Sequence, residues 1–376
     1  MWRILFITGT RADYGKQKSL IDNLSKDSLN FDVSVFVTGM HLHASYGETW
    51  REIKKDFPNL NLHLFNNEND SLGQEEILAR TISGISAFCK KNETDLIVVH
   101  GDRLEPLAGA LCGLLLRIRV CHIEGGEVSG TQDETIRHSI TKLSDYHFVA
   151  NEEAERRVKQ LGEDTKSIYR IGSPEVDLFL SGSLPSWGEV ARRYQISFKE
   201  YAILIFHPVT SEIDTLSRQA KEIAKFIETV DDNFIIILPN SDPGRENILM
   251  AWTELLNNNE RVRPLPSMRF EYFVTALKNC EYILGNSSTG VREATFFGIP
   301  SINVGTRQSG RANHPLIMNA KPSLEDLLHK RSKIGALEKK SSAAFGVGNS
   351  GQRFLEILKS QLFWAKEKQK SFFDID

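Results

Sequence analysis

The chain has 376 residues, of which 40% are hydrophobic and 25% are charged, so each of two ordinary-sized domains can bury a core. The net charge is −3 and no long basic run occurs, which excludes nucleic acid as the main partner. The cysteines form no CxxC pair or disulfide-like spacing, which predicts a reducing, cytoplasmic setting; they are Cys89, Cys112, Cys121 and Cys280.

Short apolar runs rich in Val and Ile alternate with stretches of helical periodicity, which predicts parallel strands buried between helices. The first run is too short for a signal peptide, and no apolar stretch is long enough to span a bilayer, so we expect a soluble protein with no membrane partner. In the first half the strands are expected at residues 4–8, 31–38, 96–100, 120–123, 146–150 and 168–172. In the second half they are expected at residues 202–206, 234–238, 282–285 and 301–304.

A cluster of Gly, Ser and Pro at residues 178–188 predicts a linker between two α/β domains. We expect residues 1–180 and 181–355 each to form a Rossmann-like, doubly wound domain, the two facing each other across a cleft. Residues 352–370 are amphipathic, so residues 356–376 are predicted to form a C-terminal helix that packs back on the body.

Doubly wound sheets bind ligands at the carboxyl ends of their strands, and several predicted strands end on charged residues. After the first strand, Arg11 and Lys16 follow small residues at the start of a helix, a pattern typical of an anion site. An ordinary turn capped by Asp13 explains the same pattern equally well.

Two further strand ends carry carboxylates. Asp102 and Arg103 follow strand 96–100. They are compatible with a catalytic base and a phosphate contact, or with a structural ion pair. Glu124 follows strand 120–123 and precedes Gly125 and Gly126, which suggests close approach by a bulky ligand; the alternative is a solvated glutamate before a turn.

A third carboxylate, that of Asp133, lies at the start of a predicted helix. Arg137 is on the same face of this helix, so the two residues are compatible with a simple surface ion pair. Three carboxylates in the loops of one domain nevertheless favour acid/base chemistry, because packing them together separates their protonation states. No spacing of histidines and carboxylates predicts a metal site.

The second half combines a histidine with a hydroxyl-rich turn. His207 follows a predicted strand and is placed to face the expected cleft, although a lone histidine is more often structural. Ser287 and Ser288 follow another strand, and the helix-start amides beside them can cradle a diphosphate. Glu293 is placed to reach a ribose diol, and Arg307 adds a cation at the same rim. The pattern indicates a nucleotide-diphosphate site without a Walker lysine.

Eight segments, in order between residue 3 and about residue 312, together resemble the hydrolysing UDP-N-acetylglucosamine 2-epimerases of sialic acid biosynthesis. This group includes the bacterial NeuC enzymes and the epimerase half of the animal bifunctional epimerase/kinase. The segments are GTRADYGK, VTGMH, HGDRLE, CHIEGGE, DETIRHSITKLS, FHPVT, GNSSTGVREA and GTRQSGR. Gly125-Gly126-Glu127 resembles the hydrolysing branch, since non-hydrolysing relatives tend to continue with Ala-Gly-Leu-Arg. Gly15 departs from the animal enzymes, which have a serine there.

The resemblance implies a GT-B-like architecture, a small nucleotide sugar as substrate, a homodimer, and no metal or nicotinamide cofactor. It implies anti elimination of UDP to a 2-acetamidoglucal, followed by hydration on the opposite face at C2 to give N-acetylmannosamine. By position it implies catalytic roles for Asp102, Glu124, Asp133 and His207. It implies substrate contacts for Arg11, Arg103, Ser287, Ser288, Gly290, Glu293 and Arg307. We expect Asp133 and Glu124 at C2 with Asp102 in support, although the sequence does not assign the half-reactions.

Three other functions are compatible with these residues. A sister hydrolysing epimerase of the legionaminic acid route would act on GDP-N-acetylglucosamine or a UDP-linked 2,4-diacetamido-trideoxyhexose with the same groups. The base should be selected near residues 266–271, where the sequence does not separate uracil from guanine. A GT-B glycosyltransferase would bind a similar nucleotide sugar but would need an acceptor site. A nucleotide-sugar sensor would bind UDP and leave the sugar unchanged.

Overall fold

The computed structural model describes residues 1–67, 72–129, 132–182, 184–240, 242–311, 313–367 and 369–374, without the side chains of Ser45 and Asn258. The chain divides into two compact units. Unit 1 comprises residues 1–127, 133–182 and 345–376, and unit 2 comprises residues 128–132 and 183–344. No helix of the described ranges is both long and apolar enough to cross a membrane.

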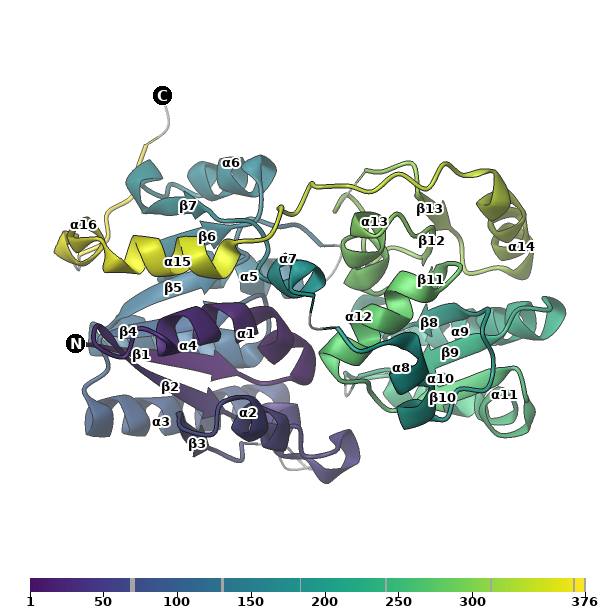
Figure 1. The fold of residues 1–376 in the computed structure, drawn as a ribbon, viewed down its shortest axis with the longest axis horizontal. Helices are drawn as coiled ribbons and strands as arrows, with labels where there is room; N and C mark the ends of the chain where they lie inside the picture. Colours follow the sequence, from purple (N-terminus) through teal and green to yellow (C-terminus); the bar gives the residue numbers. More distant parts are fainter. Residues whose placement is uncertain are drawn as a thin grey trace. The chain divides into compact units, whose positions relative to one another are not determined.

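Unit 1 is built on a seven-stranded parallel sheet with the order β3-β2-β1-β4-β5-β6-β7 (Figure 1). The strand order reverses between β1 and β4, and at such a switch point the loops after two neighbouring strands diverge and leave room for a ligand. The strands are β1 (Trp2–Thr8), β2 (Phe31–Val37), β3 (Asn61–Leu64), β4 (Leu96–His100), β5 (Arg119–Ile123), β6 (Tyr146–Val149) and β7 (Ile168–Arg170).

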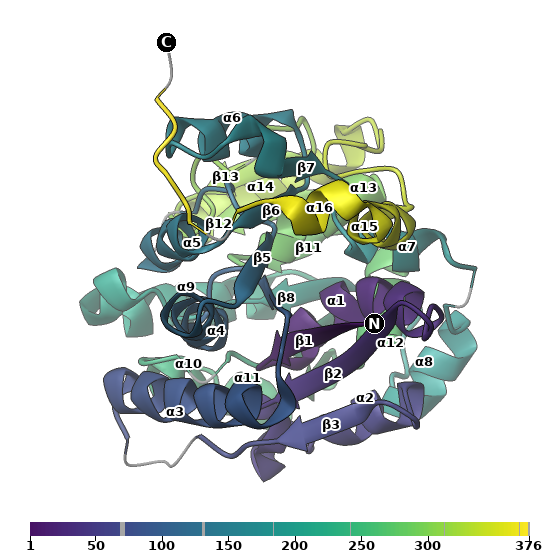
Figure 2. The ribbon, with the colours of Figure 1, turned by 90° about the vertical axis from the view of Figure 1, so that its left-hand side faces the viewer.

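Helices cover both faces of this sheet, because successive strand residues point to opposite sides and both sides are apolar. Ile4 and Phe6 of β1 pack toward one layer of helices, whereas Leu5 and Ile7 pack toward the other. The first layer includes α1 (Arg11–Ser25), α2 (Trp50–Asp56) and α15 (Ser350–Lys359). The second includes α3 (Gln74–Asn92), α4 (Leu104–Leu116) and α5 (Gln132–Leu143), as Figure 2 shows for α3 and α4. The remaining helices are α6 (Glu152–Gln160), α7 (Glu175–Leu180) and α16 (Gln361–Ala365).

Unit 2 repeats the design with a six-stranded parallel sheet, in the order β10-β9-β8-β11-β12-β13. Its switch point lies between β8 and β11. The strands are β8 (Ala202–Ile205), β9 (Phe234–Ile237), β10 (Val262–Leu265), β11 (Ile283–Gly285), β12 (Ser301–Val304) and β13 (Ile317–Ala320). One face packs on α9 (Ile213–Thr229), α10 (Arg245–Ala251), α11 (Thr253–Asn258) and α14 (Leu324–Lys333). The other packs on α8 (Trp187–Tyr194), α12 (Phe270–Asn279) and α13 (Glu293–Phe296).

The prediction of two doubly wound α/β domains is confirmed by these two sheets. All ten predicted strands are present, with ends that differ by at most two residues. The sequence reading missed β3, β10 and β13, each of which lies at the edge of its sheet or pairs with only one neighbour.

The C-terminal segment differs from its prediction in two respects. Residues 345–355 were expected in the second domain, but they belong to unit 1, where Gly346 packs on Gly172 and Asp177 caps α15. The Asp177 carboxylate accepts backbone N–H bonds from Asn349, Ser350 and Gly351 at 2.7–2.8 Å, which fixes where α15 begins. The expected single helix over 356–376 is instead the end of α15 plus α16, which ends at Ala365. Within that predicted helix, residues 368, 375 and 376 lie outside the described residues.

Candidate active site

The predicted residues of unit 1 gather at the carboxyl ends of β1, β4 and β5, three neighbouring strands at the switch point. Asp13 lies on the first turn of α1, directly after β1. Its backbone N–H donates to the Thr10 hydroxyl, so Thr10, and not Asp13 as expected, caps this helix. The Asp13 carboxylate is thereby left to accept bonds from Gln17 at 2.7 Å and from the Gly9 N–H at 3.2 Å.

A buried histidine connects the ends of all three strands. His100, the last residue of β4, places Nδ1 3.0 Å from Asp13 Oδ1 and Nε2 3.2 Å from Glu124 Oε2. Burial disfavours the imidazolium, but the hydrogen bonds and charges of the two carboxylates outweigh it and raise the pKa of His100 to about 9. At neutral pH, His100 is therefore a buried cation between two carboxylates.

Glu124 follows β5 in an uncommon backbone conformation. Its φ is +63°, in the left-handed region that non-glycine residues rarely occupy, and such conformations concentrate at functional sites. The side chain is buried and also accepts a hydrogen bond from the Ser173 hydroxyl. A side chain on Gly126, the second of the paired glycines that follow, would collide with the Ala154 carbonyl oxygen, and one on Gly125 would approach the His122 ring. Packing within the unit therefore accounts for both glycines, and a bulky ligand beside them stays a prediction.

Asp102 pairs with Arg137 of α5, and the guanidinium is almost fully buried. Arg137 also donates to the Glu127 carbonyl oxygen at 3.2 Å. Asp133 lies on the first turn of the same helix, partly buried. The Arg137 side chain therefore joins Asp102 to the helix that carries Asp133. The sequence suggested only a surface pair between Arg137 and Asp133 and did not predict the contact with Asp102.

His122 fixes the backbone in front of Asp102. Its Nε2 lies 2.8 Å from the Gly101 carbonyl oxygen, which only accepts, so Nε2 carries the proton. Its Nδ1 lies 3.0 Å from the Thr141 hydroxyl of α5. Burial is the main reason that the pKa of His122 falls to about 3, so the ring stays neutral and holds Gly101 against α5.

The cations predicted in unit 1 all have carboxylate partners. Arg11 lies 2.7 Å from Glu52 of α2. Arg103 precedes α4, and its Nε is 3.6 Å from Glu105, whose carboxylate fits against Gly9, where a side chain would collide with it. Lys16, suggested as an anion contact, lies 2.8 Å from the buried Glu175.

The unit 2 residues centre on Asn286, which follows β11 and is almost fully buried. Its side-chain oxygen accepts the His207 N–H at 2.7 Å and its side-chain nitrogen donates to the His207 carbonyl at 2.8 Å. Arg307 and Gln308 donate to the Asn286 backbone oxygen at 3.2 and 3.0 Å. The Asn240 N–H donates to His207 Nδ1 at 3.2 Å, so a neutral ring carries its proton on Nε2, the form that donates to an anion.

The serine-rich turn differs in detail from the prediction. Ser287 caps a single 3₁₀ turn, Ser288–Gly290, and α13 begins only at Glu293 and has four residues. Glu293 therefore lies at the start of α13 and is buried. Gly290 is required for packing, because a side chain there would come within 2.6 Å of the Ser301 hydroxyl.

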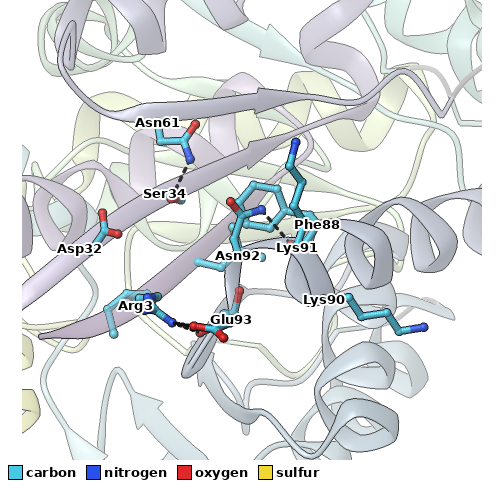
Figure 3. A pocket seen from close by; sticks show the side chains of 12 residues that line it. Arg3, Asp32, Ser34, Asn61, Phe88, Lys90, Lys91, Asn92 and Glu93 are labelled. Carbon is cyan, nitrogen blue, oxygen red and sulfur yellow. Dashed lines mark hydrogen bonds and ion pairs between the residues drawn. The ribbon is translucent and has the colours of Figure 1, made fainter.

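A cavity of about 390 Å³ lies at the opposite, amino-terminal edge of the unit 1 sheet (Figure 3). Its lining groups bond to one another: Arg3 lies 2.5 Å from Glu93, and Asn61 donates to Ser34 at 3.3 Å. None of the predicted site residues lines it. Among the residues that the structure describes, no group of three or more His, Cys, Asp or Glu side chains could hold a metal ion.

Sequence reasoning missed three members of these networks as site residues: His100, Arg137 and Asn286. The position of His100 and Asn286 in the chain could have identified them as site residues. His100 ends β4 and Asn286 directly follows β11, so both lie at the carboxyl edge of their sheets. Arg137 gave no such signal, because its contact with Asp102 depends on how α5 packs.

Comparison with known proteins identifies relatives over nearly the whole chain. Residues 22–359 match the family described as UDP-N-acetylglucosamine 2-epimerase. A UDP-N-acetylglucosamine 2-epimerase from Neisseria meningitidis is 41% identical, with both chains fully covered. A hydrolysing UDP-N,N'-diacetylbacillosamine 2-epimerase from Legionella pneumophila is 32% identical, over 95% of this chain and 96% of that one.

A solved structure shares the fold. The crystal structure of a UDP-GlcNAc 2-epimerase from N. meningitidis bound to UDP-GlcNAc has a TM-score of 0.79 and 20% sequence identity, and it covers 95% of this chain and 99% of that one. The two parallel-sheet units therefore match the GT-B-like architecture of such epimerases. Together, the extent of the family match and the identity of these relatives show that the chain belongs to the UDP-N-acetylglucosamine 2-epimerase family.

Proposed function

We propose that the chain is a hydrolysing UDP-N-acetylglucosamine 2-epimerase that releases UDP and N-acetylmannosamine for sialic acid biosynthesis. The observation that carries the proposal is the pairing of two strand-end carboxylates with different buried cations. Asp102 pairs with Arg137, and Glu124 lies against His100. Inversion at C2 needs at least two acid/base groups, because the proton leaves one face and another proton arrives on the other.

The proposed substrate carries a sugar and a diphosphate, and we assign the sugar to unit 1 groups and the diphosphate to unit 2 groups. In the elimination, a carboxylate takes the C2 proton, the C1–O bond breaks, and UDP leaves with the bonding electrons. In the hydration, a proton returns to the opposite face of C2, and water adds at C1. We assign the two proton transfers to Asp133 and Glu124, with Asp102 in support.

Departure of UDP needs positive or hydrogen-bonding groups where its charge develops. We assign this role to His207, whose neutral form carries its proton on Nε2, and to Arg307, which the Asn286 carbonyl oxygen orients. The cytoplasmic homodimer and the absence of a metal or nicotinamide cofactor stay part of this proposal. So do the further predicted contacts, which are Arg11, Arg103, Ser287, Ser288, Gly290 and Glu293.

The test is incubation of the purified protein with UDP-N-acetylglucosamine in D₂O, followed by NMR. We expect stoichiometric UDP and free N-acetylmannosamine that carries deuterium at C2. UDP-N-acetylmannosamine as the product would show a non-hydrolysing epimerase. No reaction with nucleotide sugar alone would favour a glycosyltransferase that lacks its acceptor, or a sensor.

A second candidate function is hydrolysing epimerisation of UDP-N,N'-diacetylbacillosamine. It is supported by the Legionella relative, which is named for that substrate. The same carboxylates and cations would serve that substrate. Parallel incubations with UDP-N,N'-diacetylbacillosamine and with GDP-N-acetylglucosamine separate the candidates, since the higher kcat/KM identifies the substrate that the transition state fits best.

A further inference from the structure

The C-terminal residues 369–374 contact the rest of unit 1 through a partly buried lysine. Lys370 Nζ lies 2.6, 2.8 and 3.3 Å from the carbonyl oxygens of Ser144, Lys142 and Thr141, and 2.6 Å from Glu163 Oε2. These carbonyls stand at the end of α5, which finishes at residue 143. The last carbonyls of a helix have no partner within it and carry the negative end of its dipole. A single ammonium from the end of the chain therefore caps α5.

The carboxylate beside Lys370 ties this cap to the rest of unit 1. Glu163 is about 1% exposed and accepts from Lys142 at 2.7 Å and from His147 Nε2 at 2.8 Å. His147 belongs to β6 and Lys142 to α5, so Glu163 joins a strand, a helix and the C-terminal segment at one buried point. Three donors, Lys370, Lys142 and His147, share the Glu163 carboxylate. Removal of the Lys370 charge therefore leaves the α5 carbonyls without their cap and the carboxylate with one donor fewer.

Two phenylalanines hold the same segment in register. The Phe373 N–H donates to the Gly162 carbonyl oxygen at 3.0 Å. The Phe372 ring lies so close to Gly162 that a side chain at that position would come within 2.4 Å of it, and the Lys142 ammonium lies 4.9 Å from the ring centroid. The segment is thus anchored by a backbone bond and a ring contact as well as by Lys370.

We propose that residues 369–374 form a strap that positions α5, and that Lys370 is a positioning residue for the acid/base groups at the other end of that helix. α5 carries Asp133 on its first turn and Arg137, which holds Asp102. A helix of twelve residues moves as a rigid rod, so a cap that fixes its last turn also fixes the placement of its first. The proposed effect on catalysis rests on the epimerase function proposed above.

The test compares Lys370→Met, which keeps the length and apolar stem but removes the charge, with the control Lys278→Met. Lys278 is an exposed lysine on the last turn of α12 in unit 2. For Lys370→Met we expect kcat to fall on the order of tenfold, as for loss of one partly buried charge at a helix end. KM should stay within about twofold, because the substrate-binding groups of unit 2 are untouched. Amide hydrogen exchange at residues 141–145 should accelerate by about tenfold, and exchange in β1 and β4 should not.

Phe372→Ala is the second variant, since the ring is 67% exposed and its loss should not prevent folding. It should change kcat and the exchange at residues 141–145 in the same direction by a smaller factor. Faster exchange with an unchanged kcat in both variants would show that the segment only stabilises unit 1 and would overturn the positioning role. Unchanged exchange would overturn the strap itself. If the unmodified protein turned over no nucleotide sugar, the proposed function would fail, whereas the exchange measurement would still decide the strap.

Discussion

Charge balance at the ends of β1, β4 and β5 depends on one imidazole. Asp13 and Glu124 approach the two nitrogens of His100 from opposite sides, and all three side chains are buried. Two carboxylates without this cation would face each other in a site of low dielectric, where an uncompensated charge is costly. His100 therefore supplies the positive charge that balances these two buried carboxylates.

The first prediction follows from this cation. The folded pKa of His100, about 9, lies above the value of about 6.5 for an unfolded histidine. The resulting stability is therefore fully present below pH 6.5 and disappears as the pH rises through 9, and its upper limit is about 3 kcal/mol. We expect an NMR titration of the His100 ring to have its midpoint near pH 9, and His100→Gln to flatten the fall in unfolding free energy between pH 6.5 and 9. The exposed His329→Gln serves as control, and a midpoint near pH 6 would contradict the assignment.

The second prediction compares the loss of the Asp102 carboxylate with the loss of a carboxylate at the other end of β4. Asp102→Asn should lower kcat by about 100-fold or more, because its carboxylate supports the groups that transfer protons at C2, and should leave UDP affinity within about threefold. Asp95→Asn is the matched control, because Asp95 immediately precedes β4, at the end opposite Asp102, and its carboxylate accepts a hydrogen bond from the Arg3 N–H. Turnover gives kcat and calorimetry gives UDP affinity. Equal losses in both variants would show that the effect comes from the strand and not from the site.

At the scale of the elements, the sequence predicts the interior of each sheet better than its edges. Strands such as β8 and β9 are apolar throughout because helices cover both faces, and this composition is visible in the chain. The missed strands pair on one side only and carry polar residues; β10 contains Pro264, which a central strand would not tolerate. Because these edge strands are short and partly polar, their sequences do not differ from those of loops.

The sequence likewise predicts only part of the candidate site. Asp102, Glu124 and His207 each lie one or two residues after the end of a strand, so the rule of parallel strand ends places them. The partners of these residues come from tertiary packing: Arg137 reaches Asp102 from α5, and Ser173 reaches Glu124 from beyond β7. No local pattern in the chain encodes such contacts, which is why the sequence identified the carboxylates and not the cations that pair with them.

The third prediction concerns the connection between β8 and β11. Asn286→Ala removes two buried hydrogen bonds to the His207 backbone, so it should destabilise unit 2 by about 2–3 kcal/mol and weaken UDP binding by about tenfold or more. Asn303→Ala removes a part-buried Asn303–Asn319 bond between β12 and β13 of the same sheet. It should cost stability but leave UDP affinity unchanged, as calorimetry and urea unfolding would show. Equal weakening of UDP binding in both would remove Asn286 from the site.

At the scale of the whole molecule, unit 1 depends on chain that follows unit 2. Phe354, Leu358, Phe363 and Trp364 are buried in the same core as Ile4 of β1. Trp364 also stacks on Trp2, with ring centroids 3.8 Å apart. Each such side chain contributes about 1.5–3 kcal/mol when buried. Together they approach the entire net stability of a typical domain, about 5–15 kcal/mol.

The fourth prediction follows from this dependence. A chain that ends at Ala344 should lose native packing in unit 1 and keep it in unit 2, whose cores, among the described residues, contain none beyond 334. Hydrogen exchange should then be rapid in β1 and β4 and slow in β8 and β9, although β1 and β4 are sequence-distant from the deletion. Addition of a peptide of residues 345–374 should restore protection to β1 and β4. Slow exchange in both units of the shortened chain would mean that the first 182 residues form a complete core, and the C-terminal helices would then be a cover and not a part of the fold.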